Sequence, residues 1–234
     1  NGTAVDRSLS DTVTWSATYT KNLGAGVTGF VGIESSDERD QRVFDGTAAV
    51  AHDGGLPAVI AGLGYNQGWG SLNLHGAVKE VTAAGAEGEF GYAVQGTAKF
   101  NLDMLTAGSS IVFNAAYTDG ALSYVGARSD ARDFDGVLNG NKIETTKAYS
   151  LGAGVIFQVM EDVSLRAEGT YLDVDAFGSA LDYDRYAVAG SVDWTPAAGL
   201  RIAGVLSHAK NDFADVAVAD EEETRFTVRV QHDF

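Results

Sequence analysis

Histidine side chains are the groups in this sequence best suited to bind metals or to transfer protons near neutral pH. The chain holds four, His52, His75, His208 and His232. They are widely separated, and none has a second histidine at a ligand spacing such as His-x-x-x-His. Cysteine is absent, which excludes cysteine-ligated metals and disulfides. We therefore expect no metal site and no cofactor.

A hydrolytic site would need a nucleophile whose side chain meets a base. Ser207 and His208 are adjacent, so within a β-strand their side chains point to opposite faces and cannot form a dyad. The glycines at positions 62, 64, 68 and 70 lack the following helix and lysine of a phosphate-binding loop, and they suit barrel curvature and tight turns instead. The sequence thus predicts no catalytic residue and no enzyme.

Carboxylates gather in one late segment, at Asp212, Asp215, Asp220, Glu221, Glu222 and Glu223. This segment has two interpretations, a solvated acidic loop or a site for divalent cations that bridge it to lipopolysaccharide, because hard cations prefer carboxylate oxygens. Over the whole chain, 32 Asp and Glu outnumber 16 Lys and Arg, for a net charge of -16. Such an excess of negative charge disfavours nucleic acid as a partner.

The elements that position these side chains are expected to be β-strands. The chain has 29 glycines but only 2 prolines, and its mean hydropathy is -0.05. No stretch approaches the ~18 consecutive apolar residues that a membrane-spanning helix needs. Instead, apolar and polar residues alternate, as between positions 11 and 20, where Val13, Trp15, Ala17 and Tyr19 share one face.

The same alternation recurs in eleven segments, and the connections between them alternate in length. Short turns are expected at 21–26, 66–70, 101–108, 160–162 and 195–199, and longer polar loops at 35–57, 80–88, 120–146, 175–181 and 211–223. Aromatic residues gather near the strand ends, where a membrane has its headgroups. Short turns on one side and long loops on the other are typical of an outer-membrane β-barrel. A soluble β-sandwich is the alternative, although its strands are usually shorter.

The final segment, residues 224–234, alternates and ends in Phe234, and it resembles the closing strand common to outer-membrane proteins. Residues 11–19, 58–70 and 71–78 resemble the alphaproteobacterial general porins. This resemblance implies a sixteen-stranded, trimeric, water-filled barrel whose third extracellular loop folds inward to narrow the pore. On this basis residues 1–10 are the tail of that constriction loop, and residues 11–234 form the transmembrane wall. Because bacterial barrels have even strand numbers and no open edge, we expect five further strands before residue 1.

With the apolar face assigned to lipid, the opposite face of each strand points into the lumen. The charged residues predicted to line the pore are Lys79, Lys99, Arg166, Glu168, Arg185, Asp193, Arg201, Arg225 and Arg229. The five arginines lie on the last four strands, and one basic strip formed by them would tune ion selectivity. Alternatively, each arginine pairs locally with an acid such as Glu168, Asp193 or Asp233.

These observations predict a passive outer-membrane porin for small hydrophilic solutes. The expected partners are outer-membrane lipid, lipopolysaccharide and two further copies in a homotrimer. A barrel that serves mainly as a structural or adhesion protein, through loops 35–57 and 120–146, is the second hypothesis. A soluble all-β binding module is the third.

Overall fold

The computed structural model describes residues 14–51, 54–127, 132–178 and 181–233, so the predicted tail of the constriction loop, residues 1–10, lies outside them. An 11-stranded sheet forms most of the molecule. Its strands, in spatial order, are β1 (Ser16–Gly24), β2 (Val27–Glu34), β5 (Ala58–Gln67), β6 (Gly70–Val81), β7 (Glu89–Asn101), β8 (Ser110–Asp119), β11 (Lys147–Gln158), β12 (Val163–Asp175), β13 (Tyr183–Ala197), β14 (Leu200–Phe213) and β15 (Glu221–His232). The eleven segments expected from alternation are confirmed.

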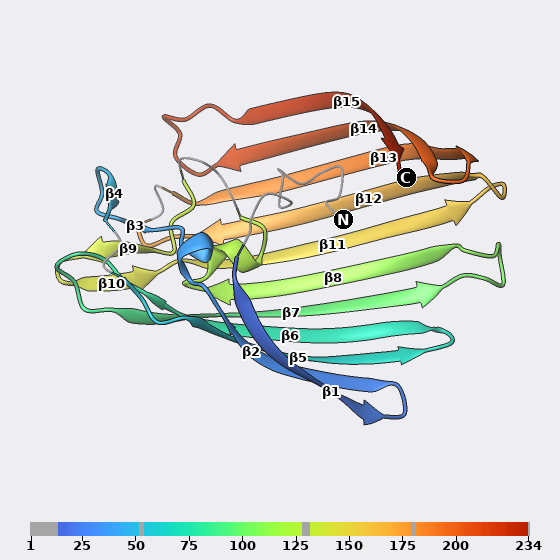
Figure 1. Ribbon diagram of the computed structural model, residues 1–234. Coiled ribbons are helices and arrows are strands. Elements are labelled where there is room, and N and C mark those ends of the chain that lie inside the picture. The colour runs from blue at the N-terminus through green and yellow to red at the C-terminus, as the bar shows by residue number, and fades with distance from the viewer. Residues whose placement is uncertain (1–13, 52–53, 128–131, 179–180, 234) are drawn as a thin grey trace.

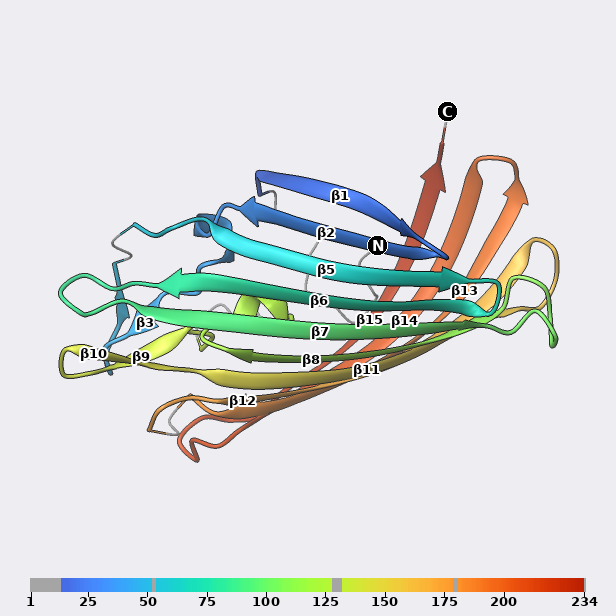
Figure 2. The same cartoon turned by 90° about the horizontal axis from the view of Figure 1, so that it is seen from below.

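Each long strand pairs antiparallel with the next one along the chain, and the sheet bends into a deep trough (Figures 1 and 2). Strands β1 and β15 form its two edges, so the described sheet is open. None of the described helices is long and apolar enough to cross a membrane.

The outer face of the trough carries the predicted apolar residues. On β5, for example, Val59 is 51% exposed and Leu63 is 53% exposed. Ala58, whose side chain points to the opposite face, is fully buried. In a soluble sandwich a second sheet would cover such a face. No second sheet covers it in the part of the chain that the structure describes. A continuous apolar surface of this extent fits contact with lipid.

Aromatic residues border this apolar face at both ends. One row of tyrosines follows the long-loop end, with ring centroids 5.8 to 6.2 Å apart at three of its contacts: Tyr92, Tyr117, Tyr149, Tyr171 and Tyr186. At the short-turn end Trp69 packs between Tyr65 and Phe100, and Trp194 lies on β13. Along β13 the distance from Tyr186 to Trp194 is ~26 Å at ~3.3 Å per residue. Because transmembrane strands tilt by ~35–45°, this length corresponds to a height of ~20 Å, slightly less than the ~25 Å apolar band between the aromatic girdles of such barrels.

The two ends of the sheet differ as expected. At the short-turn end, β1 and β2 are joined by Ala25 and Gly26 alone. Gly26 has a φ of +82°, and a Cβ there would lie 2.2 Å from the carbonyl oxygen of Asn66, so this turn requires glycine. The long loops 35–57 and 120–146 both leave the opposite end. The predicted asymmetry holds for these connections, whereas 102–109 at the short-turn end has eight residues and 82–88 at the opposite end has only seven.

The described residues of these two loops, 35–51, 54–57, 120–127 and 132–146, fold together into what we call the cap, which the sequence did not predict. It contains η2 (Asp37–Arg39), η3 (Leu122–Tyr124) and a 4-stranded sheet of order β10-β9-β3-β4. The strands are β3 (Val43–Phe44), β4 (Ala49–Val50), β9 (Gly136–Asn139) and β10 (Lys142–Thr145). Strands β3 and β9 pair in parallel and join the two loops.

Candidate pore lining

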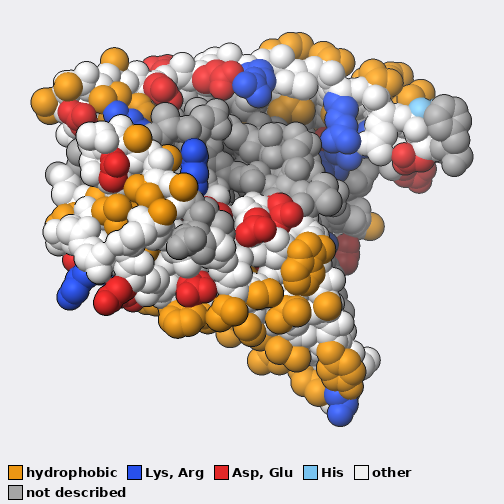
Figure 3. All heavy atoms as spheres, turned by 60° about the vertical axis from the view of Figure 1, so that its left-hand side comes forward, with side chains coloured by type: hydrophobic (Ala, Val, Ile, Leu, Met, Phe, Trp, Pro, Cys, Tyr) orange, Lys and Arg blue, Asp and Glu red, His pale blue; other side chains and the backbone are white. Residues whose placement is uncertain are grey.

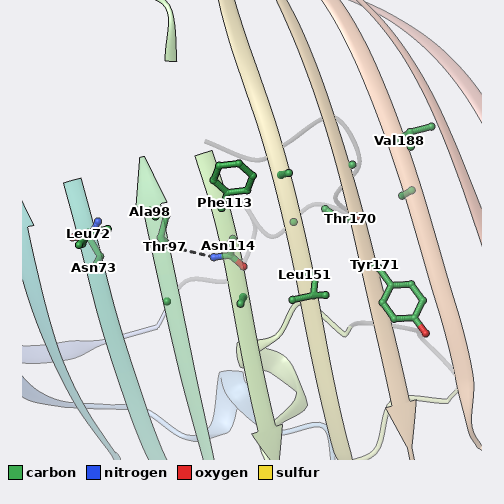
Figure 4. A pocket seen from close by; sticks show the side chains of 16 residues that line it. Leu72, Asn73, Thr97, Ala98, Phe113, Asn114, Leu151, Thr170, Tyr171 and Val188 are labelled. Atoms are coloured by element: carbon green, nitrogen blue, oxygen red, sulfur yellow. Dashed lines mark hydrogen bonds between the residues drawn. The ribbon is translucent and has the colours of Figure 1, made fainter. Parts of the chain in front are cut away.

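The inner face of the middle strands carries small polar side chains. Figure 4 shows Asn73, Thr97 and Asn114 on the adjacent strands β6, β7 and β8, and Thr170 on β12 beyond β11; Asn114 Nδ2 donates to Thr97 Oγ1 at 3.0 Å. The hollow drawn there runs from β6 to β13, and its lining also includes residues of the outer face: Leu72, Phe113, Leu151, Tyr171 and Val188. Glycine and alanine keep the wall thin at this level. The row of Asn73, Thr97 and Asn114 on the inner face fits a water-filled lumen.

Three of the predicted arginines cluster on the inner face near the short-turn end. Arg166 and Arg201 both bind the carboxylate of Asp193: Arg166 Nε lies 3.1 Å from Oδ2, and Arg201 Nε donates to Oδ1 at 2.6 Å. Ser191 Oγ also donates to Asp193, at 2.9 Å. The register places Arg229 opposite Ala203, which in turn lies opposite Asp193, so Arg229 belongs to the same level.

The charges of this arginine cluster do not cancel. The Asp193 side chain is 4% exposed, whereas those of Arg166 and Arg201 are 42% and 40% exposed. Two guanidinium groups therefore share one buried carboxylate, while Arg229 on the same level donates to Gln231 Oε1 at 3.0 Å, so the positive charges of the cluster exceed the negative charge of Asp193. A permeating anion would find several charged donors here.

The two remaining arginines lie at other depths. Arg225 is opposite Ser207 in the middle of β15, and its Nη2 lies 2.6 Å from Glu223. Arg185 is near the long-loop end, where its Nη1 donates to Asn211 Oδ1 at 2.7 Å. Glu168 lies on β12 between Gly154 and Ala189, level with Ser207. The register thus divides the predicted arginines by depth, and local acids bind three of them.

The two predicted lysines have contrasting environments. Lys99 is exposed on β7, near the short-turn end. Lys79 is only 2% exposed, because the cap covers this part of the inner face. Its Nζ lies 2.5 Å from Asp135 Oδ2 and 3.5 Å from Asp40 Oδ1. Lys79 therefore contacts the cap and not the open lumen.

Sequence reasoning missed Asp135, since a carboxylate in a long loop carries no periodic signal. The Asp135 side chain is fully buried. Burial raises the pKa of its carboxyl, and the nearby ammonium of Lys79 acts in the opposite direction.

The acidic segment near the long-loop end is partly paired. Lys210 binds Asp212 and lies 3.6 Å from Asp220, and Asn211 Nδ2 donates to Glu221 at 3.0 Å. Among the residues that the structure describes, no three His, Asp or Glu side chains come together as a metal-binding group.

Comparisons with known proteins find porins and outer-membrane channels that are similar to this chain. A family model described as "Porin subfamily" matches residues 3–233. The outer membrane channel DcaP of Acinetobacter baumannii superposes with a TM-score of 0.77 at 18% identity, covering 94% of this chain and 62% of that one. An anion-selective porin from Comamonas acidovorans gives a TM-score of 0.61 at 16% identity, covering 94% and 59%. The chain thus spans less than two thirds of either channel. No curated protein matches it.

Proposed function

The chain belongs to the porin subfamily and has the fold of an outer-membrane β-barrel, and from this premise we propose that the complete protein conducts small hydrophilic solutes by passive diffusion. The observation that carries the proposal is the contrast between the two faces of the sheet. The outer face is apolar between two aromatic rows, whereas the inner face of the middle strands carries small polar side chains. A wall of this kind separates lipid from water.

Closure of the barrel is part of the proposal. Strands β1 and β15 expose unpaired backbone groups, which lipid cannot satisfy. The resemblance to alphaproteobacterial general porins supports five further strands, a sixteen-stranded barrel and a homotrimer. Lipopolysaccharide would then surround the long-loop end, where the acidic segment lies.

The arginine cluster supports a preference for anions at the short-turn end. Its guanidinium groups outnumber the single carboxylate, and rings of such groups bias channels toward anions. One of the similar solved structures is described as an anion-selective porin. We assign the same preference to this channel.

Liposome swelling tests the proposed diffusion. The complete protein, reconstituted in liposomes, is expected to admit neutral sugars at rates that fall with sugar size and rise linearly with the concentration gradient. Small carboxylates should enter faster than neutral solutes of equal size. Saturation at low solute concentration would contradict passive diffusion, and the absence of swelling would contradict a channel altogether.

A barrel that serves mainly in surface interactions is the second candidate, and the cap is the observation that favours it. Three buried hydrophobic clusters involve cap residues, so the cap is a folded unit with an outer surface of its own. This candidate requires a barrel that passes no ions, so conductance separates the two functions.

The substitution Asp193→Asn tests the role of the arginine cluster. Removing this carboxylate leaves Arg166 and Arg201 without their shared counter-charge, so we expect the anion preference in a salt gradient to increase. Asp162→Asn is the matched control, because Asp162 accepts a hydrogen bond from Trp194 Nε1 in a turn and not in the cluster. A decrease in anion preference for Asp193→Asn would show that the arginines do not act on permeating ions.

A further inference from the structure

The cap packs against the inner face of the sheet instead of projecting away from it. From η3 and its surroundings, Leu122, Val125 and Ala127 form one buried cluster with inward-facing residues of four strands: Ala116, Ala148, Leu172, Val174 and Tyr183. A second cluster joins Val43 and Ile143 of the cap to Val81 at the end of β6. Near the long-loop end the inner wall is therefore apolar and covered by protein, unlike the polar wall farther along.

One carboxylate connects the three parts that meet here. Asp135, in loop 120–146, binds Lys79 of β6 at 2.5 Å. The same side chain accepts hydrogen bonds from the backbone N–H of Gln41 at 3.0 Å and of Leu122 at 2.8 Å. Its backbone N–H donates to the carbonyl of Arg42 at 2.9 Å. Asp135 thus joins the barrel wall to both loops of the cap.

The burial of this pair indicates a positioning role. The side chains of Lys79 and Asp135 are 1% and 0% exposed. Taking two charges out of water costs several kcal/mol per ion, and apolar residues often fill such a site with equal or better stability. In the position that the cap occupies, the pair is fully bound, and Lys79 Nζ also donates to the carbonyl of Arg39 at 3.2 Å. It therefore selects the position of the cap.

The surface that is held in this way carries charge. Arg39 Nε lies 3.4 Å from Glu34 Oε1, and the Arg39 guanidinium lies 5.1 Å from the centre of the Tyr124 ring. The Tyr124 hydroxyl donates to the same carboxylate oxygen at 2.5 Å. The Arg39 side chain stays 26% exposed, beside the exposed Glu38. Figure 3, seen from the long-loop end, shows acidic and basic side chains on this part of the molecule.

We propose that the cap is a second constriction of the channel, distinct from the loop that precedes β1, and that Lys79 and Asp135 are the positioning pair that holds it in the lumen. This inference rests on the proposed function, since a constriction acts only in a barrel that conducts. In this proposal Lys79 fixes the position of the cap at the channel entrance, and Arg39 and Glu38 contact the passing solutes.

A double-mutant cycle tests the pair. Lys79→Met, Asp135→Asn and the double variant are compared with Lys147→Met, the same change at an exposed lysine at the start of β11. In the folded, detergent-solubilised protein, each single variant is expected to be cleaved within residues 35–57 and 120–146 ~100-fold faster or more, because one buried charge loses its partner. The double variant should lose less than the product of the two single effects.

Channel measurements complete the test. Both single variants should show larger single-channel conductance and admit larger sugars, while Lys147→Met keeps the parent's cleavage pattern and size limit. Unchanged cleavage in the single variants would overturn the positioning role. Faster cleavage with unchanged conductance would overturn the constriction. A parent that passes no ions would instead contradict the proposed function, and cleavage would still decide whether the pair holds the cap.

Discussion

Replacing Arg166, Arg201 and Arg229 together by glutamine is expected to abolish the anion preference of the channel. These residues lie with Asp193 on one level of the inner face, and their substitution leaves a negative charge where an excess of positive charge was. A unit charge ~4 Å from a passing ion contributes ~1 kcal/mol even in water. Each lost guanidinium therefore lowers the local anion concentration roughly five-fold.

The measurement is the reversal potential across a planar bilayer under a salt gradient, at low ionic strength, where screening is weak. Arg185→Gln is the matched control, since Arg185 also faces inward but lies near the long-loop end and donates to Asn211. Its reversal potential should shift less than that of the triple variant. An unchanged anion preference in the triple variant would show that the cluster serves only the wall's structure.

A charge on the outer face should destabilise the barrel far more than the same charge on the inner face. Leu74 and Asn73 are neighbours on β6, but Leu74 is 53% exposed on the apolar side and Asn73 lies on the polar wall. Leu74→Arg is expected to lower the free energy of unfolding in lipid by ~2–4 kcal/mol, because the guanidinium would lie near the middle of the apolar band.

Asn73→Arg is the control for size and charge in that experiment, and it should leave stability nearly unchanged while reducing conductance. Denaturant unfolding in lipid vesicles gives both free energies. Equal losses for the two variants would mean that the faces do not differ in environment, and the assignment of lipid and lumen would then be wrong.

The strands and their faces could be predicted because alternation is a local property of the chain. Val59, Leu63 and Tyr65 are exposed on the outer face of β5, as their spacing in the sequence predicts. The alternating loop lengths were equally visible. Both signals depend on nearby residues only, and no distant contact is needed to interpret them.

The cap could not be predicted for the opposite reason. Strands β3 and β4 have two residues each, too few to show any period, and β3 pairs with β9 from a distant part of the chain. Lys79 was predicted to line the pore from its place in the alternation, whereas its burial and its contact with Asp135 depend on a loop from a distant part of the chain. Side-chain direction follows from spacing, whereas the neighbours of that side chain follow from tertiary folding.

The depth of each arginine along the barrel could not be predicted from the sequence either. Alternation gives the face of Arg166 and of Arg201 but not the level at which either meets Asp193, because level depends on the register between strands. Once the register is known, the arginines separate into the cluster near the short turns and the two residues nearer the cap.

Single-channel conductance of the complete protein in a planar bilayer tests the central claim most directly. An open barrel with a water-filled lumen should give large ohmic steps, and a homotrimer should give them in groups of three. A silent bilayer, despite inserted and folded protein, would contradict the diffusion channel and leave the outer surface of the cap as the functional part of the molecule.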